Sequence, residues 1–172
     1  FDSSNNKVIL AFESQGDCAA SGYSGCAVVG TVSGTSISFG TIVEFDDGGG
    51  VHHGAATFDS NSNKVVIAYD DQDDSNTGRA IVGTVSGTSI SFGSPTTFNS
   101  AQTGDIATAF DTTNNKIVIA YRDTGNSNYG TAIVGTVSGT SISFGSEAVF
   151  WDSARTDSMH QIAFIPGYGV LI

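Results

Sequence analysis

The amino-acid sequence predicts an all-β fold made of one four-stranded antiparallel unit that is repeated along the chain. The segment GTVSGTSISFG occurs unchanged three times, at 30–40, 83–93 and 135–145. Turn-forming residues interrupt the chain roughly every 8–12 residues, a spacing typical of short strands. No stretch shows the apolar period of a helix, so an all-β fold follows.

Four strand-like runs follow one another in each unit, and their composition changes in order. The first run, 55–58, is short and made of small residues, which suits a crowded central axis. The second, 64–69, is almost wholly apolar, as in a strand covered on both faces, and the third, 79–85, follows it. The fourth, 89–92, alternates polar and apolar residues like an outer strand. This order favours a β-propeller with four-stranded antiparallel blades over a tandem β-sandwich or a β-solenoid.

We expect a single β-propeller repeat region over 1–172 that holds about three blades. The predicted units are a partial blade at 1–46, blades at 51–98 and 104–150, and a partial blade at 158–172. A propeller ring usually has about four to eight blades. The chain is therefore expected to be part of a larger ring or of an oligomeric ring of identical chains. Since it opens in mid-unit, we expect a processed product or a piece of a longer protein.

The charge of the chain excludes some partners. Seventeen acidic residues against six Lys and Arg give a formal net charge of −11. Nucleic acid is not an expected partner, because binding to a phosphate backbone depends on Lys and Arg. No apolar run is long enough to span a bilayer, so membrane insertion is not expected either. The many Ser, Thr, Asn and Gly residues suit an extracellular, secreted or virion-surface protein.

The two cysteines, Cys18 and Cys26, lie in one loop of the first unit. Eight residues apart across a hairpin loop, they can close a disulfide, which is the favoured interpretation. The alternative is a pair of free thiols in a reducing compartment.

Alternating strand directions divide the connections between two faces of the predicted molecule. Turns between the first and second runs are almost identical (DSSNN, DSNSN, DTTNN), as are those between the third and fourth, and they form what we call the constant face. Loops at the other end, the variable face, differ in length and chemistry. Diversified loops on a repeated frame favour a binding site there, although neutral drift gives the same pattern.

Trp151 is the most distinctive residue of these loops, since it occupies the place of Asp46 and Asn99 in the other units. It is expected to be exposed, to stack on a sugar ring or a partner side chain, or else to plug the space between blades. Charged and aromatic loop residues make up the predicted ligand-binding set. They are Asp46, Asp47, His53, Asp105, Arg122, Asp123, Trp151, Asp152 and Arg155.

Metal sites are weakly indicated. Four carboxylates at Asp70, Asp71, Asp73 and Asp74 offer oxygen ligands for Ca²⁺, but the spacing is not that of an EF-hand, and a solvated acidic turn is favoured. His52, His53 and His160 lie near the start of first runs and are interpreted as surface or channel-lining residues in preference to zinc ligands. We expect no cofactor, with Ca²⁺ the one candidate.

Motifs for catalysis are missing, so no catalytic residue is predicted. The sequence contains no G-x-S-x-G, no S-x-D-x-G-x-x-W box of sialidase propellers and no phosphate-binding glycine loop before a helix. Carboxylate pairs for glycoside hydrolysis exist among the loop acids, but nothing singles one out.

The segment GTVSGTSISFG, with SNKVVIAY at 62–69 and YGTAIVGTV at 129–137, resembles repetitive β-propeller-like repeats. Such repeats occur in large surface proteins of marine microbes and of the phages and viruses that infect them. The resemblance covers essentially the whole chain and implies an extracellular or virion-surface repeat module, without catalytic or binding residues to carry over.

We therefore expect a non-enzymatic binding or adhesion module that recognises a surface glycan or protein through its variable face. One alternative is a structural repeat or spacer in a fibre or surface appendage. A second is a polysaccharide-active glycoside hydrolase or lyase.

Overall fold

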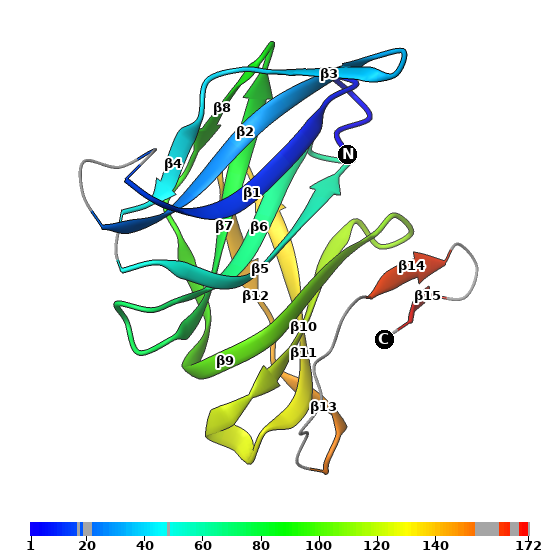
Figure 1. The fold of residues 1–172 in the computed structure, drawn as a ribbon. Coiled ribbons are helices and arrows are strands. Elements are labelled where there is room, and N and C mark those ends of the chain that lie inside the picture. The colour runs from blue at the N-terminus through cyan, green and yellow to red at the C-terminus, as the bar shows by residue number, and fades with distance from the viewer. Residues whose placement is uncertain (17, 19–21, 48, 154–161, 166–168, 172) are drawn as a thin grey trace.

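The computed structural model describes residues 1–16, 18, 22–47, 49–153, 162–165 and 169–171, and it is all-β (Figure 1). Its strands pair antiparallel, and among the described residues no sheet closes on itself. The predicted all-β class and antiparallel pairing are confirmed.

The first repeat forms an antiparallel sheet of its own, whereas the strands of the second and third repeats are joined into one sheet through a long strand that belongs to both. The first repeat contains four strands, β1 (Val8–Gln15), β2 (Tyr23–Ser33), β3 (Ser36–Phe39) and β4 (Val43–Asp46). The second contains β5 (Val51–Asp59), β6 (Lys64–Asp71), β7 (Thr77–Ser86), β8 (Ser89–Phe92) and the start of β9 (Thr96–Asp111). The third contains the rest of β9, β10 (Lys116–Asp123), the 3-10 helix η1 (Thr124–Asn126), β11 (Tyr129–Ser138), β12 (Ser141–Phe144) and β13 (Ala148–Trp151). The hairpin of β14 (Ala163–Ile165) and β15 (Gly169–Leu171) follows.

The outer strand of each sheet is broken in two, which the sequence analysis does not anticipate. β2 pairs with β3 and then with β4. In the same way β7 pairs with β8 and then with the start of β9, and β11 pairs with β12 and then with β13. The breaks fall at Gly40, Gly93 and Gly145, whose N–H groups still bond to the inner neighbour. A Cβ at Gly40 would collide with the carbonyl of Thr88, and one at Gly93 with that of Thr140, so the next repeat presses against these breaks.

The turns of the constant face are fixed by one aspartate each. The Oδ1 of Asp59 accepts hydrogen bonds from the backbone N–H groups of Asn61 and Ser62, and Asn63 takes the left-handed conformation (φ 55°). Asp2 and Asp111 make the same pair of bonds in their repeats. This explains why D-x-x-N/S-N recurs, since the side chain replaces the backbone acceptors of a tight turn.

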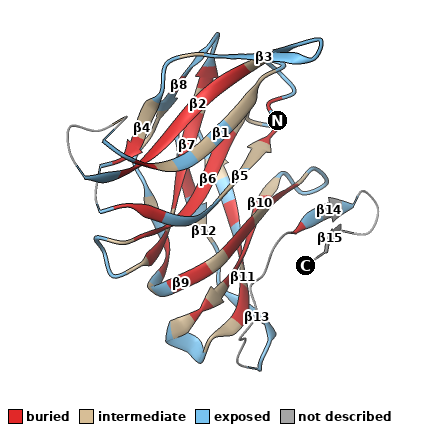
Figure 2. Cartoon of the chain, viewed as in Figure 1, coloured by how far each residue is buried: buried red, intermediate tan, exposed pale blue. Residues whose placement is uncertain are grey.

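The repeats pack face to face, and the core lies in the layers between them. Along β6, Val65, Ile67 and Tyr69 face the first repeat, whereas Val66 and Ala68 face the third. Both faces of this strand are buried, as Figure 2 shows along most of β6. Burial on both sides accounts for the continuous apolar run in the sequence.

Aromatic rings connect neighbouring repeats at two equivalent places. Phe45 lies 5.3 Å from Tyr69 and 5.6 Å from Phe92 of the next repeat, measured between ring centroids. In the next layer, Phe98 lies 5.1 Å from Tyr121 and 5.9 Å from Phe144. We call each set an aromatic trio.

First strands of successive repeats lie side by side around a shared hollow. This cavity of about 420 Å³ is lined by residues that occupy equivalent positions, with three phenylalanines and three turn hydroxyls among them. These residues are Phe1, Phe58, Phe110, Ser3, Ser60 and Thr112. The repeats are thus turned about a common line, with their small first strands nearest to it.

Candidate functional site

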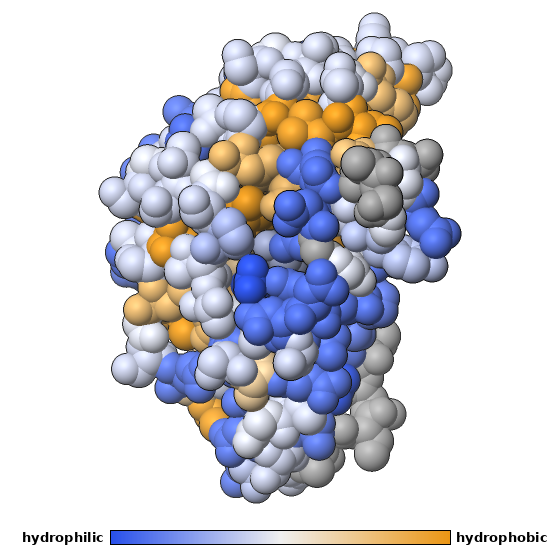
Figure 3. All heavy atoms as spheres, turned by 90° about the vertical axis from the view of Figure 1, so that its left-hand side faces the viewer, coloured by the Kyte–Doolittle hydropathy of each residue, from blue (hydrophilic) through white to orange (hydrophobic). Residues whose placement is uncertain are grey.

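A pocket of about 380 Å³ opens between the first and second repeats, in what we call the first gap. Its walls come from β4, from the loop between β6 and β7, and from Pro95. Phe45, Asp46, Asp47, Asp71, Asp73, Asp74, Arg79 and Pro95 line it. Figure 3 views the molecule from the side of these loops, where hydrophilic residues gather in the middle. With five carboxylates and one guanidinium, the pocket is strongly anionic.

Arg79 organises the acidic loop. Its Nη1 lies 2.9 Å from Oδ2 of Asp71, and its Nη2 lies 2.8 Å from Oδ2 of Asp74. Hydrogen bonds from Arg79 and from Thr77 lower the pKa of the Asp74 carboxyl. Within the described part of the chain, no acceptor bonds the buried Nε of Arg79, so one donor of the guanidinium is unused.

Asp46 closes the inner end of the pocket. It is buried, and its Oδ2 accepts a hydrogen bond of 2.8 Å from the hydroxyl of Tyr69. Burial, and then the charge of Asp46, raise the pKa of Tyr69, so that this hydroxyl stays protonated as a donor. The Tyr69 ring therefore belongs to the aromatic trio while its hydroxyl orients a pocket carboxylate.

The equivalent second gap, between the second and third repeats, is filled by a polar network. Asn99 stands where the first gap has Asp46, and its Nδ2 lies 3.0 Å from Oγ1 of Thr103 and 3.2 Å from Oδ1 of Asp123. The side chain of Ala101 lies against Gly125, where a Cβ would collide with it. The predicted binding residue Asp123 is thus buried in a structural network.

Trp151 occupies the same position in the third repeat. It pairs with Gly130 as Asp46 pairs with Gly25 and Asn99 pairs with Gly78. It is 54% exposed, as the sequence comparison of the repeats predicts. Its neighbour Asp152 is also exposed, whereas Arg155 lies outside the described residues.

Charged residues also meet where the first strands reach the variable face. His53 Nδ1 lies 3.3 Å from Oδ2 of Asp70, and Arg122 Nε lies 2.7 Å from Oδ2 of Asp105. His53 and Asp105 are equivalent and both left-handed (φ 47° and 52°), at irregularities where the first strand bulges. In the second repeat the carboxylate thus lies on the second strand, and in the third repeat it lies on the first strand.

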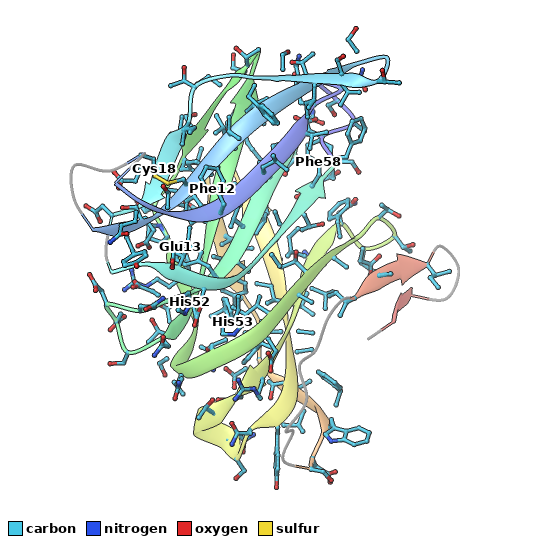
Figure 4. All side chains as sticks on the ribbon, in the orientation of Figure 1. Phe12, Glu13, Cys18, His52, His53 and Phe58 are labelled. Carbon is cyan, nitrogen blue, oxygen red and sulfur yellow. A yellow bond between two sulfur atoms is a disulfide. The ribbon has the colours of Figure 1, made fainter. Side chains whose placement is uncertain are left out.

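The first repeat adds a contact that the sequence analysis missed. Glu13 holds the position of Asp70 and Arg122, and its Oε2 lies 3.4 Å from Nε2 of His52 in the second repeat. Figure 4 shows Glu13, His52 and His53 close together below β1. An alignment of the three repeats would have marked Glu13, and likewise Arg79, which replaces Cys26 and Thr131.

The four aspartates of the calcium hypothesis are not gathered around one point. Asp71 and Asp74 are both bound by Arg79, and Asp70 contacts His53. Among the residues that the structure describes, no group of three or more His, Cys, Asp or Glu side chains is placed to hold a metal ion. The calcium hypothesis gains no support from this geometry, and His160 lies outside the described residues.

Cys18 and Cys26 form the predicted disulfide, with a Cα–Cα distance of 6.2 Å. It ties the loop after β1 to the buried start of β2. Such bonds are typical of an oxidising environment. Within the described ranges, no helix has the length and apolar character needed to cross a membrane.

Comparison with known proteins found no matching family, no matching curated protein and no matching solved structure.

Proposed function

We propose that the chain is a non-enzymatic binding or adhesion module of an extracellular or virion surface, which recognises a glycan through its variable face. The observation that carries this proposal is the position shared by Asp46, Asn99 and Trp151. One frame presents a carboxylate, an amide and an indole at three equivalent places: Asp46 is buried at the inner end of an open pocket, Asn99 is buried, and Trp151 is exposed to a ligand. Variation on a constant frame is how binding surfaces are built on repeats.

The chemistry of the first gap selects the kind of glycan. Carboxylates accept hydrogen bonds from sugar hydroxyls or from an ammonium group, and the first gap offers five of them. Sulfated or uronic-acid chains are disfavoured, because five aspartates would repel them. Trp151 supplies a flat apolar surface for the face of a sugar ring. The proposed ligand is therefore a neutral or amino-sugar glycan.

The frame in this proposal is a β-propeller to which further repeats contribute. Face-to-face packing of the repeats and the shared hollow at their first strands support it. The resemblance of the repeats to those of microbial and viral surface proteins agrees with the same assignment.

A glycan array with the full chain tests the proposal. We expect binding to neutral or amino-sugar glycans, with at least a tenfold loss in Trp151→Ala or Asp47→Asn, about 1.4 kcal/mol. Thr35→Ala, an exposed residue in a turn of the constant face, is the matched control and should bind as wild type. Absence of binding to every glycan would exclude the glycan ligand, and binding to proteins alone would assign the face to a protein partner.

A structural spacer is the second candidate, supported by the near identity of the three repeats. It predicts regular filaments whose formation is insensitive to changes in the variable loops, visible by electron microscopy. An enzymatic role stays a prediction that reducing-sugar release from polysaccharides would test.

A further inference from the structure

The first repeat leaves one apolar face uncovered. Leu10, Phe12, Val32, Ile37 and Phe39 are all between 36% and 51% exposed. They belong to β1, β2 and β3 and form a continuous surface, which we call the leading face. Contiguous apolar surface of this kind usually marks an interaction site.

The same positions are buried in the repeats that follow. Ile67, Tyr69 and Ile90 in the second repeat, equivalent to Leu10, Phe12 and Ile37, are no more than 3% exposed. They are covered by the opposite face of the preceding repeat, through residues such as Ala27, Val29 and Phe45. The third repeat is covered by the second in the same way. In both contacts between successive repeats, the face equivalent to the leading face is therefore covered by the opposite face of the preceding repeat.

The covering face is itself left open at the third repeat, and we call it the trailing face. Val134 and Phe150 are 45% and 38% exposed, whereas their equivalents Val29 and Phe45 are 0% and 8% exposed. Phe150 is the counterpart of Phe45 and Phe98, which begin the two aromatic trios.

The strand pairing is also unfinished at both ends. Among the described strands β1 pairs only with β2, so that its other edge lacks the first strand that β6 and β10 have. At the trailing face, Ile162, which directly precedes β14, packs against Ala107, Ala109 and Ala120, so that β14 begins in the place of a first strand. β14 is paired with β15 over only three residues. An eight-residue strand such as β1 offers a longer partner.

We propose that the leading face of the first repeat binds the trailing face of the third repeat of a second copy of this chain. Phe150 of one copy then forms a third aromatic trio with Phe12 and Phe39 of the other. β14 lies beside β1 of the other copy, in place of β15, and completes a four-stranded sheet from two chains. The contact is head-to-tail, so it either closes into a ring or continues as a filament.

Two complementary variants test this proposal by native mass spectrometry and sedimentation. Phe12→Asp damages only the leading face, and Phe150→Asp only the trailing face. Both side chains are partly exposed, so each variant should fold. We expect wild type to form assemblies of two or more chains and each variant alone to be a monomer. A one-to-one mixture of the variants should form a dimer that grows no further, because only one intact pair of faces remains.

Tyr23→Asp is the control, since Tyr23 is 47% exposed at the first residue of β2, where the second repeat has Asn76. It should assemble as wild type does. A wild-type chain that stays monomeric at every accessible concentration would overturn the proposal. So would assemblies that survive both substitutions, or a mixture that contains only monomers. Circular dichroism that matches wild type for each variant confirms that loss of assembly is not loss of folding.

Discussion

The first and second gaps are built on equivalent aromatic trios, but the first gap is open and the second is filled. Both rest on an aromatic trio, Phe45 with Tyr69 and Phe92 in one and Phe98 with Tyr121 and Phe144 in the other. Above the trio the first gap is an open acidic pocket, and the second is closed by hydrogen bonds. The packing of the repeats thus fixes the frame, and a few loop residues decide whether a gap is open.

One difference is the hydrogen-bond partner of the residue at the shared position, which is Asp46 in the first gap and Asn99 in the second. Asp46 accepts from the Tyr69 hydroxyl beneath it, whereas Asn99 donates sideways to Asp123. The other difference is the filler, since Ala101 occupies the second gap next to Gly125. The substitutions below separate the shared aromatic trios from these differences.

Removal of a trio ring should have the largest effect, and it should be equal in the two gaps. Phe45→Ala and Phe98→Ala each delete a ring that is less than 9% exposed and should cost about 3–5 kcal/mol of unfolding free energy. Urea denaturation measures both. Phe39→Ala removes a half-exposed ring from the leading face and should cost far less in the monomer. Unequal losses for Phe45 and Phe98 would show that the two foundations differ.

Asn99→Asp gives the second gap the residue of the first. It places a buried carboxylate about 3 Å from that of Asp123 and should cost about 2–4 kcal/mol at neutral pH. The cost should shrink as pH falls and one carboxyl becomes protonated. The reverse change, Asp46→Asn, keeps an acceptor for Tyr69 and should cost about 1 kcal/mol or less. Denaturation of both variants between pH 4 and pH 8 decides the point, and a costless Asn99→Asp would contradict it.

Tyr69→Phe should change how stability depends on alkaline pH. Burial, and then Asp46, raise the pKa of Tyr69 above its usual value of 10.0. Its contribution is complete below pH 10, where the unfolded chain is also protonated, and it is lost as pH rises further. Wild type should lose about 1.4 kcal/mol per pH unit above pH 10 for this group, and Tyr69→Phe should not. Near neutral pH the variant should cost about 1–2 kcal/mol through the lost bond to Asp46.

Tyr121→Phe should remove the same dependence on alkaline pH in the second gap, since burial, followed by Glu147, raises the pKa of Tyr121. Tyr23→Phe, at an exposed tyrosine, is the control. Denaturation midpoints at several pH values above 8 would reveal a contradiction if all three variants lost stability in parallel with wild type.

Asp74→Asn should have the smallest effect, because Asp74 is at the open edge of the first gap and Arg79 keeps its bond to Asp71. The pKa of Asp74 is lowered, so its contribution is present above pH 3.8 and is lost as pH falls below that value. We expect slightly lower stability than wild type at pH 7 and a slightly weaker loss in acid, where the protonated wild-type carboxyl resembles the amide. Thermal unfolding at pH 3 and pH 7 measures both, and a large loss at pH 7 would show that Arg79 depends on Asp74.

The sequence predicted what depends on one repeat alone, which is the order of strands, the Asp turns, the disulfide and the exposure of Trp151. The apolar run also predicted burial of the second strand on both faces, but the individual contacts between repeats were not predicted. Gly40 marks a break only because the carbonyl of Thr88 in the next repeat presses on it. Arg79 pairs with Asp71 and Asp74 in the folded loop, and these contacts are not evident in the sequence. Because both carboxylates bind Arg79, the geometry gives the predicted calcium cluster no support.

The carboxylates Asp70 and Asp105 lie on different strands of their repeats, the second and the first. This difference bears on how similar repeats pair their strands correctly during folding. Repeat proteins are prone to exchange strands between similar units during folding. If the first strand of the third repeat paired with β6, Asp105 would face Asp70, two carboxylates with no cation between them. Its correct partner β10 offers Arg122 at 2.7 Å. The different placement of the carboxylate in the two repeats thus favours pairing of each first strand with the second strand of its own repeat.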